Sequence, residues 1–143
     1  MYQRDHLSHT DAQQIIARIQ VELERKSKAA AIAVADSQGE LIAFLRTDGC
    51  RLPSITIAIN KAFTAAREQK ETGDIGASSR TKGFPMTNFG DLRYTAWGGG
   101  VPIVAQGQVV GAVAVSGLSE AEDVVLARLG ARVIGTFEPE PEE

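Results

Sequence analysis

Two apolar runs separated by a short polar segment form the clearest pattern in the chain. The runs cover residues 101–105 and 109–115, and Gly107 lies between them. Glycine adopts the positive φ that a tight connection between twisted strands requires, so this pattern predicts a β-hairpin. The second run consists of valine and alanine apart from Gly111, which is typical of a central strand covered on both faces. We expect another element to pack close to its backbone.

A second pair of apolar runs precedes the first. It covers residues 30–36 and 40–46, with Gly39 in the connecting segment, and predicts a second hairpin. Ile32 and Val34 share one face of the first strand because successive side chains alternate between faces. The alanines between them leave room for a neighbour on the other face.

Three further segments have apolar residues at helical spacing. The first runs from about residue 10 to 26, after a Ser8 N-cap with Asp11 three residues on. The second begins at Pro53, since proline is tolerated in a first turn, and continues to about residue 69. The last follows a Ser119 N-cap with Glu122 at the capping-box position. The predicted buried stripes are Ile15, Ile16, Ile19 and Leu23; Ile55, Ile59, Ala62, Phe63 and Ala66; and Val125, Leu126, Leu129 and Val133.

Residues 70–96 have no clear period and are interrupted by glycine and proline. We expect an irregular segment that includes one short strand and is held by apolar anchors. Irregular segments of this length are more often functional than idle. Two hairpins imply an antiparallel sheet, and the helices must cover it. The sequence therefore predicts an α+β domain of the profilin-like or roadblock-like kind, with an antiparallel sheet of about five strands covered by helices.

Composition narrows the functional classes. The chain has 143 residues and a formal net charge of −3, with Lys and Arg scattered, which does not support a nucleic-acid partner. The single cysteine, Cys50, excludes an internal disulfide. No stretch approaches the roughly 20 apolar residues of a membrane span. We expect a cytoplasmic protein with neither a nucleic-acid nor a membrane partner.

Two separated segments resemble motifs of the GlcG/HbpS-like family. Residues 46–66 resemble its R-x-D-G-A…S…A…K-A-x-T-A segment, and residues 99–117 resemble its G-G-x-P-[IL]…G…G-A-[IV]-G-V-S-G hairpin. Asp123 and Ala127 fall where the family continues D…A. Two positions depart from the pattern, with Cys50 in place of the usual alanine and Ala114 in place of the usual glycine.

The resemblance covers about residues 7–135 and implies a single domain of this family over residues 1–137. Residues 138–143, Glu-Pro-Glu-Pro-Glu-Glu, are expected to form an acidic, proline-rich flexible tail. The family includes haem-binding and haem-degrading proteins and the C-terminal domain of some PduO-type corrinoid adenosyltransferases. The resemblance also implies a homo-oligomer assembled through helices and loops.

Histidine commonly holds haem iron, and only His6 and His9 are present. Because the resemblance implies haem near the first helix in some members, His9 is the candidate axial ligand and His6 the alternate. The competing interpretation is an exposed histidine in the first helical turn.

Several other residues could contact a ligand. Asp48 and Lys61 lie on the first motif and, with Tyr94, are the candidates for catalysis, although Asp48 and Lys61 could instead form a structural pair. The backbone N–H groups of Gly99 and Gly100 could bind an anion, or belong to a plain turn. The remaining candidates lie in the irregular segment, where aromatic and cationic side chains could form the mouth of a site or fill the core: Phe84, Arg93 and Tyr94, with Arg80 and Lys82 nearby. Cys50, beside Arg51, could have a lowered pKa or be inert.

The sequence and the resemblance together favour a small-ligand-binding domain, for haem or a related tetrapyrrole, that acts as a homo-oligomer. One alternative is an enzyme that acts on a small organic acid or a diol-derived metabolite. Another is a non-catalytic accessory or assembly subunit.

Overall fold

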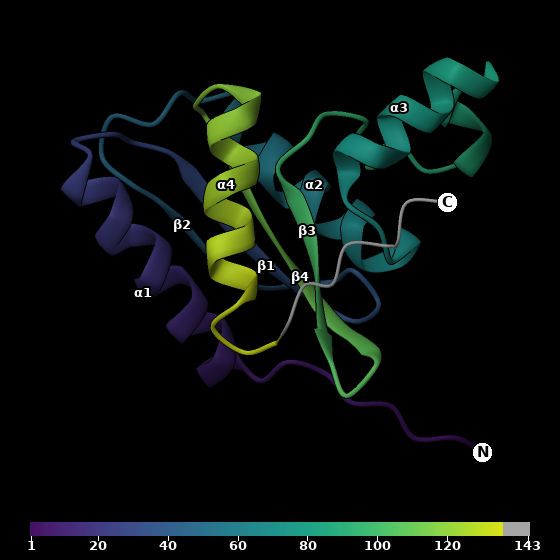
Figure 1. Ribbon diagram of the computed structural model, residues 1–143, viewed down its shortest axis with the longest axis horizontal. Helices are drawn as coiled ribbons and strands as arrows, with labels where there is room; N and C mark the ends of the chain where they lie inside the picture. The colour runs from purple at the N-terminus through teal and green to yellow at the C-terminus, as the bar shows by residue number, and fades with distance from the viewer. Residues whose placement is uncertain (136–143) are drawn as a thin grey trace.

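The computed structural model describes residues 1–135 (Figure 1), so the predicted tail at residues 138–143 lies outside the described residues. The elements follow in the order α1 (His9–Arg25), β1 (Ala31–Asp36), β2 (Leu41–Arg46), α2 (Ser54–Glu68), α3 (Thr72–Lys82), the 3-10 helix η1 (Met86–Phe89), β3 (Gly100–Ala105), β4 (Gln108–Ser116) and α4 (Glu120–Ala131).

The strands form an antiparallel sheet in the order β2-β1-β4-β3, which confirms the predicted α+β class. In the described part of the chain the sheet has four strands rather than about five. The β3–β4 turn places Gln106 and Gly107 at φ values of 51° and 76°, the positive angles that the hairpin pattern predicts. Strand β4 is central and is buried from Val109 to Ser116. A Cβ on Gly111 would lie 2.4 Å from the carbonyl oxygen of Ala35, so the predicted close approach is confirmed.

The helices cover both faces of the sheet. In Figure 1, α1 and α4 lie in front of the strands and α2 lies behind them. Ile32 and Val34 of β1 join the aliphatic cluster under α1 and α4, whereas Ala33 and Ala35 point toward α2. The alternation along this strand is therefore as predicted.

The predicted helices form with close to their expected bounds. Ser8 accepts from the N–H of Asp11 at 3.0 Å while its own N–H donates to the Asp11 carboxylate, so α1 begins with a full capping box. All four predicted stripe residues of α1 are buried. The stripe predicted for α4 is partly wrong, because Val125 and Val133 are exposed. Helix α4 instead buries a narrower face made of Asp123, Leu126, Ala127, Gly130 and Ala131.

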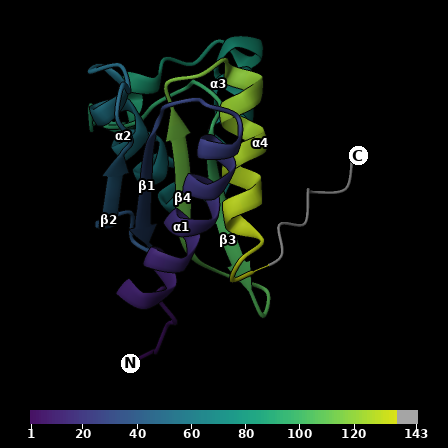
Figure 2. The same cartoon turned by 90° about the vertical axis from the view of Figure 1, so that its left-hand side faces the viewer.

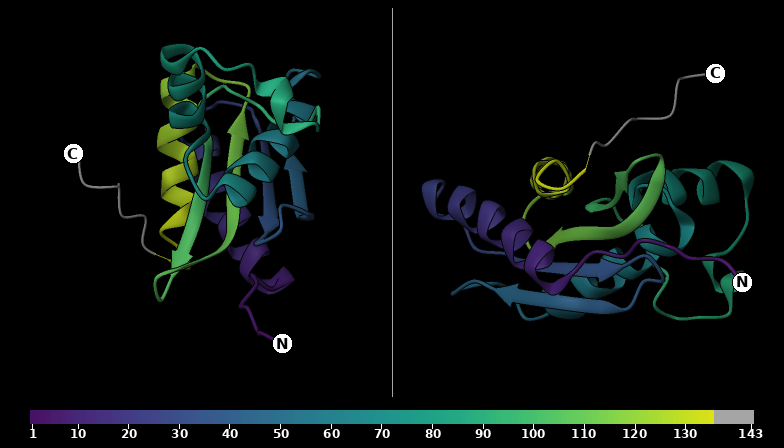
Figure 3. Two further views of the ribbon diagram at one scale, coloured as in Figure 1. Left: turned by 90° about the vertical axis from the view of Figure 1, so that its right-hand side faces the viewer. Right: turned by 90° about the horizontal axis from the view of Figure 1, so that it is seen from below.

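Residues 70–96 are not irregular throughout, which corrects the sequence prediction. Helix α3 and the η1 turn replace the expected loop and short strand. Helix α3 buries only Thr72, Ile75 and Gly76, all near its start, so no apolar stripe marks it in the sequence. Gly83, one of the apparent loop signals, is the left-handed residue that ends the helix. Figures 1 and 3 show α3 projecting beyond β3, on the side of the molecule away from α1.

Candidate functional site

An open cavity of about 390 Å³ lies at the end of the sheet where β4 finishes and where α2 and α4 begin. Its volume falls within the roughly 300–1,000 Å³ that is typical of small-molecule sites. The described residues that line it are Arg51, Pro53, Ser54, Ile57, Lys61, Trp97, Gly98, Ser116, Gly117, Leu118, Glu120 and Asp123.

Helix α2 supplies one wall through residues at helical spacing. Ser54, Ile57 and Lys61 recur at intervals of three and four residues, so they share one side of the helix. The other walls come from the end of β4, the start of α4, and the segment that leads into β3.

A buried ion pair forms the floor of the cavity. Lys61 is 2% exposed and Asp123 is 3% exposed, which is rare for charged residues unless they are paired. The Lys61 ammonium donates to Asp123 Oδ2 at 3.3 Å and to the carbonyl oxygen of Val115 at 3.0 Å. Asp123 Oδ1 accepts from the Leu118 N–H at 3.1 Å. The pair therefore joins α2, the end of β4 and the start of α4.

Burial acts against the charged form of both partners. It lowers the pKa of Lys61, against the opposing attraction of Asp123. It likewise raises the pKa of Asp123, against the attraction of Lys61. The cavity therefore contains an amine and a carboxyl group that are each easier to neutralise than their free counterparts.

Glycines allow the β3 entry segment to pass next to this pair. A Cβ on Gly99 would lie 2.8 Å from Lys61 Nζ and 2.7 Å from the Val115 carbonyl oxygen, and the φ of Gly99 is +120°. The N–H of Gly98 donates to Glu120 Oε1 at 2.9 Å, and the N–H of Gly100 donates to Thr72 Oγ1 at 2.9 Å. These two N–H groups already have acceptors within the chain.

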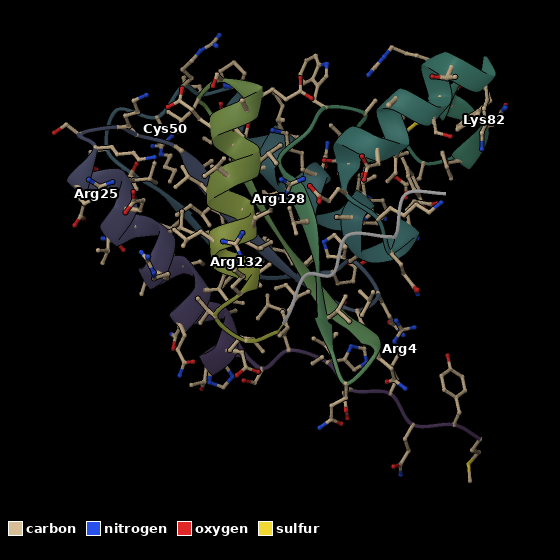
Figure 4. The ribbon with its side chains drawn as sticks, in the orientation of Figure 1. Arg4, Arg25, Cys50, Lys82, Arg128 and Arg132 are labelled. Carbon is tan, nitrogen blue, oxygen red and sulfur yellow. The ribbon has the colours of Figure 1, made fainter. Side chains whose placement is uncertain are left out.

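Lys61 is the predicted ligand or catalytic residue that lines this cavity, and Gly99 lies directly behind it. The alternative that Lys61 pairs with Asp48 is wrong, because its carboxylate partner is Asp123. Asp48 is exposed in the loop between β2 and α2. Cys50 lies in the same loop, at the upper end of the molecule in Figure 4. Burial raises the pKa of its thiol, so the lowered pKa considered from its neighbour Arg51 is also wrong.

The predicted aromatic and cationic mouth is a packed cluster beside α2. The ring of Tyr94 stacks on Phe89 at 4.3 Å between centroids and meets the edge of Phe63 at 5.3 Å. The Arg93 guanidinium lies 3.9 Å from the centroid of the Phe63 ring and pairs with Asp91 at 2.9 Å. None of these side chains is among the residues that line the cavity.

The other members of the predicted mouth also lie outside the cavity. Phe84 is half-buried between α3 and η1, and Arg80 and Lys82 are exposed near the end of α3. Figure 4 shows Lys82 at the outer tip of that helix. Of the segment between Gly73 and Trp97, it is Trp97 that reaches the cavity wall.

His6 and His9 are exposed at the opposite end of the sheet. The Leu7 N–H donates to the Val110 carbonyl oxygen at the start of β4, whereas the cavity lies where β4 ends. His6 Nδ1 lies 2.8 Å from the hydroxyl of Ser37, which directly follows β1. The six residues of β1 separate the two ends, a distance of about 17 Å at strand spacing. Figure 2 shows the same separation, with the start of α1 at the bottom and the start of α4 at the top.

Sequence reasoning did not assign a site role to Ser54, Ser116 or Asp123. All three belong to the segments that carried the family resemblance, so that signal could have identified them. The structure joins the two motifs and the D…A position around one cavity.

Two absences concern residues 1–135. No helix in this range has both the length and the apolar character needed to cross a bilayer. The same residues contain no group of three or more His, Cys, Asp or Glu side chains arranged to hold a metal ion.

Comparison with known proteins gives consistent relatives. Residues 7–132 match the family described as haem degrading protein HbpS-like. Protein GlcG of Escherichia coli K12 is 38% identical over 117 residues, which are 77% of this chain and 81% of that protein. An uncharacterised 15.0 kDa protein from the dhaT-dhaS intergenic region of Citrobacter freundii is 36% identical over 101 residues, which cover 66% of this chain and 68% of that protein.

Solved structures share the whole fold. ORFY of Klebsiella pneumoniae superposes with a TM-score of 0.89 at 26% identity, covering 96% of this chain and 97% of its own. A double mutant of HbpS from Streptomyces reticuli gives 0.85 at 27% identity, covering 95% of this chain and 92% of its own. A complex of PduOC with haem gives 0.83 at 20% identity over 90% of this chain and 95% of its own, a similarity of fold alone. Because the family model matches residues 7–132 and the two motifs meet at one cavity, the chain belongs to the HbpS-like family.

Proposed function

We propose that this protein binds a small amphipathic ligand in the cavity, with haem or a related tetrapyrrole as the first candidate, and that it does so as a homo-oligomer. The observation that carries the proposal is a cavity with apolar walls and cationic groups. Pro53, Ile57 and Trp97 supply apolar surface. Lys61 and Arg51 are the cationic residues, and they lie in the same lining as the acidic Glu120 and Asp123. A tetrapyrrole combines an apolar ring with acidic side chains, and the haem-degrading description of the matched family supports the same class.

The cavity suits the ring and acid groups of haem better than its iron. Among the described residues of its wall there is no His, Cys, Met or Tyr, the usual axial ligands. His6 and His9 of the same chain are at the far end of the sheet, so a histidine that reaches this cavity would belong to a second copy. This links the haem proposal to the proposed homo-oligomer.

Of the two histidines, the local structure favours His6 as an iron ligand. The Ser37 hydroxyl lies 2.8 Å from its Nδ1 and orients the ring, which leaves Nε2 for a metal. His9 is also exposed, but among the described residues its ring has no such orienting contact, so it is the second choice. When bound, haem would supply the iron and its redox chemistry, while this chain would bind and orient the ring and its acid groups.

A haem titration tests the proposal. Wild-type protein at micromolar concentration should give a shifted Soret band, and His6→Ala should move or remove the shift more than His9→Ala does. Trp97→Ala should weaken binding about tenfold, because it removes a wall of the cavity and about 1.4 kcal/mol of contact. Leu92→Ala, at a position that is 92% exposed, is the matched control.

A wild-type protein that gives no Soret shift would remove haem from consideration. Size-exclusion chromatography of the same sample tests the proposed homo-oligomer. A protein that is monomeric both with and without haem would contradict it. Residues 1–137 as one domain, and a cytoplasmic location, are part of the same proposal.

The buried Lys61–Asp123 pair favours a second candidate function, an enzyme acting on a small organic acid or a diol-derived metabolite. Burial favours the neutral amine of Lys61 and the neutral carboxylic acid of Asp123. A neutral amine can accept a proton and a neutral acid can donate one, as acid–base catalysis requires. Asp48 and Tyr94 lie outside the cavity, so Lys61 with Asp123 would carry the chemistry. A thermal-shift screen of organic acids tests this function, because a ligand that binds only the folded state raises the melting temperature. A stable oligomer that gives neither a Soret shift with haem nor a thermal shift with these acids would favour an accessory subunit.

A further inference from the structure

We propose that the floor of the cavity is a subsite for a carboxylate group, formed by the hydroxyls of Ser54 and Ser116 and the ammonium of Lys61. This inference rests on the proposed function in one respect, because it takes the cavity to be a binding site. It goes further by naming the chemical group that any ligand must present there, whether the ligand is haem or a smaller acid.

The two serine hydroxyls are the first observation. Ser54 and Ser116 are each 5% exposed and both line the cavity. Within residues 1–135 neither hydroxyl has a hydrogen-bond partner, which is unusual because buried polar groups are normally paired. No fully enclosed side-chain polar atom in that range lacks a partner. The small exposed part of each serine must therefore include its hydroxyl oxygen, which faces the cavity.

The ammonium of Lys61 is the second observation. It has three N–H donors, and the described residues offer it two acceptors, the Val115 carbonyl oxygen and Asp123 Oδ2. The third N–H has no acceptor among the described residues, and Lys61 lines the cavity. Gly99 permits this arrangement, because a Cβ at that position would lie 2.8 Å from Lys61 Nζ.

The unused groups of the floor can each donate a hydrogen bond, whereas both carboxylates beside them already accept at least one. Asp123 accepts from Lys61 and from the Leu118 N–H, and Glu120 accepts from the Gly98 N–H. A ligand that satisfies the free donors must therefore bring acceptor oxygens. A carboxylate does so with two oxygens that can each accept more than one bond. The two acidic side chains nearby favour a singly charged carboxylate over a doubly charged phosphate.

Sequence and structure place these groups together. Ser54 and Lys61 lie seven residues apart on one side of α2. The Ser54 hydroxyl packs against Gly117, whose Cβ would lie 3.4 Å away, and Gly117 directly follows Ser116. Ser54 and Lys61 come from one motif of the family resemblance and Ser116 from the other.

Trp97 provides a direct readout of the subsite. It is the chain's one tryptophan, lines the cavity and is 60% exposed, so its fluorescence reports on a molecule that enters. Propionate and benzoate should change the Trp97 emission at constant ionic strength. Propionamide and benzamide, which have the same shape without the charge, should bind at least about tenfold more weakly. Inorganic phosphate should also bind more weakly than propionate.

The Ser54→Ala/Ser116→Ala variant should weaken propionate binding by about tenfold or more without lowering the melting temperature of the free protein. Its hydroxyls have no partner to lose in the folded chain, so their removal is not expected to destabilise it. Ser78→Ala, on α3 and outside the cavity, is the matched control and should bind as wild type does.

Equal binding of the acids and their amides by wild-type protein would overturn the carboxylate subsite, and this comparison needs no variant to fold. Equal binding by the double serine variant, or stronger binding of phosphate, would overturn it as well. Entry of neutral benzamide with no preference for benzoate would leave the cavity as a ligand site while removing the subsite. The Soret titration then decides the haem proposal separately.

Discussion

The two faces of the sheet are packed in different ways. Toward α1 and α4 the strands present branched aliphatic side chains, and the register places Ile32 opposite Val115 and Val34 opposite Val113. Toward α2 they present alanine, with Ala33 opposite Ala114. Because the side-chain period of a strand is two, one run of alternating sequence builds both faces at once.

This difference separates stability from the site. The aliphatic face packs into the larger cluster of buried apolar side chains and so contributes more to folding. The alanine face instead lets the backbone of α2 approach the sheet, and a Cβ on Gly100 would lie only 2.6 Å from the Lys61 carbonyl oxygen. The close approach allows the Lys61 side chain to reach Val115 and Asp123, and it brings Ser54 to the end of β4.

The largest expected effect comes from the aliphatic face. Leu23→Ala removes a side chain that is 0% exposed and leaves a cavity, so the free energy of unfolding should fall by about 2–5 kcal/mol in urea denaturation. Val21→Ala, on the same helix but 59% exposed, should change it by no more than about 0.5 kcal/mol. Equal losses for the two variants would contradict the assignment of the core to this face. Ligand binding by folded Leu23→Ala should be unchanged.

Overpacking of the alanine face should cost less stability than Leu23→Ala does, but it should also weaken ligand binding in the cavity. Ala62→Leu adds volume to a residue that is 1% exposed, and a cost of about 1–3 kcal/mol is expected. Since α2 must move away from the sheet, carboxylate binding reported by Trp97 should weaken too. Ala17→Leu makes the same change at an exposed position of α1 and should affect neither property. A stable Ala62→Leu protein with unaltered binding would show that the close approach is not required.

The smallest effect is a matter of sign and concerns the charged pair. The folded pKa of Lys61 is lowered, so the unfolded chain binds more protons below pH 10.5 and stability rises with pH up to that value. The folded pKa of Asp123 is raised, so stability falls as pH rises above 3.8. The free energy of unfolding of wild-type protein, relative to that of Lys61→Met/Asp123→Leu, should therefore be lowest near neutral pH. Urea denaturation of both proteins between pH 3.8 and 10.5 measures this difference in the free energy of unfolding. A maximum of the wild-type relative stability near neutral pH would contradict the inferred cost of burying the pair.

The fold was largely predictable because its signals are local. Ile32 and Val34 alternate with alanines, Ser8 and Asp11 cap a helix, and Gly107 closes a hairpin, each within a few residues of chain. Helix α3 was missed because it is short and buries only its first turn, so it has no stripe to detect. The predicted α4 stripe was partly wrong because Gly130 and Ala131 pack inward. Such small residues contribute little to a hydrophobic pattern, so the sequence did not mark this face as buried.

The site was less predictable than the fold. Lys61 stood out through its motif, but its partner is 62 residues away in the chain and could not be inferred from spacing. The composition of the aromatic segment predicted the mouth of a site, yet Phe89 and Tyr94 stack on each other and do not line the cavity. Ser54 and Ser116 look ordinary in sequence, because a serine is remarkable only when its hydroxyl is buried without a partner.

The two hairpins, the helices α1, α2 and α4, the two kinds of sheet face and the caps of α1 and α4 were determined by the sequence alone, because alternation, periodicity and capping act between residues close in the chain. Tertiary structure decided which charges meet, which polar groups keep a free donor, and that the histidines lie far from the cavity. Those outcomes depend on desolvation and on contacts between distant segments, and both exist only after the chain has closed around its core.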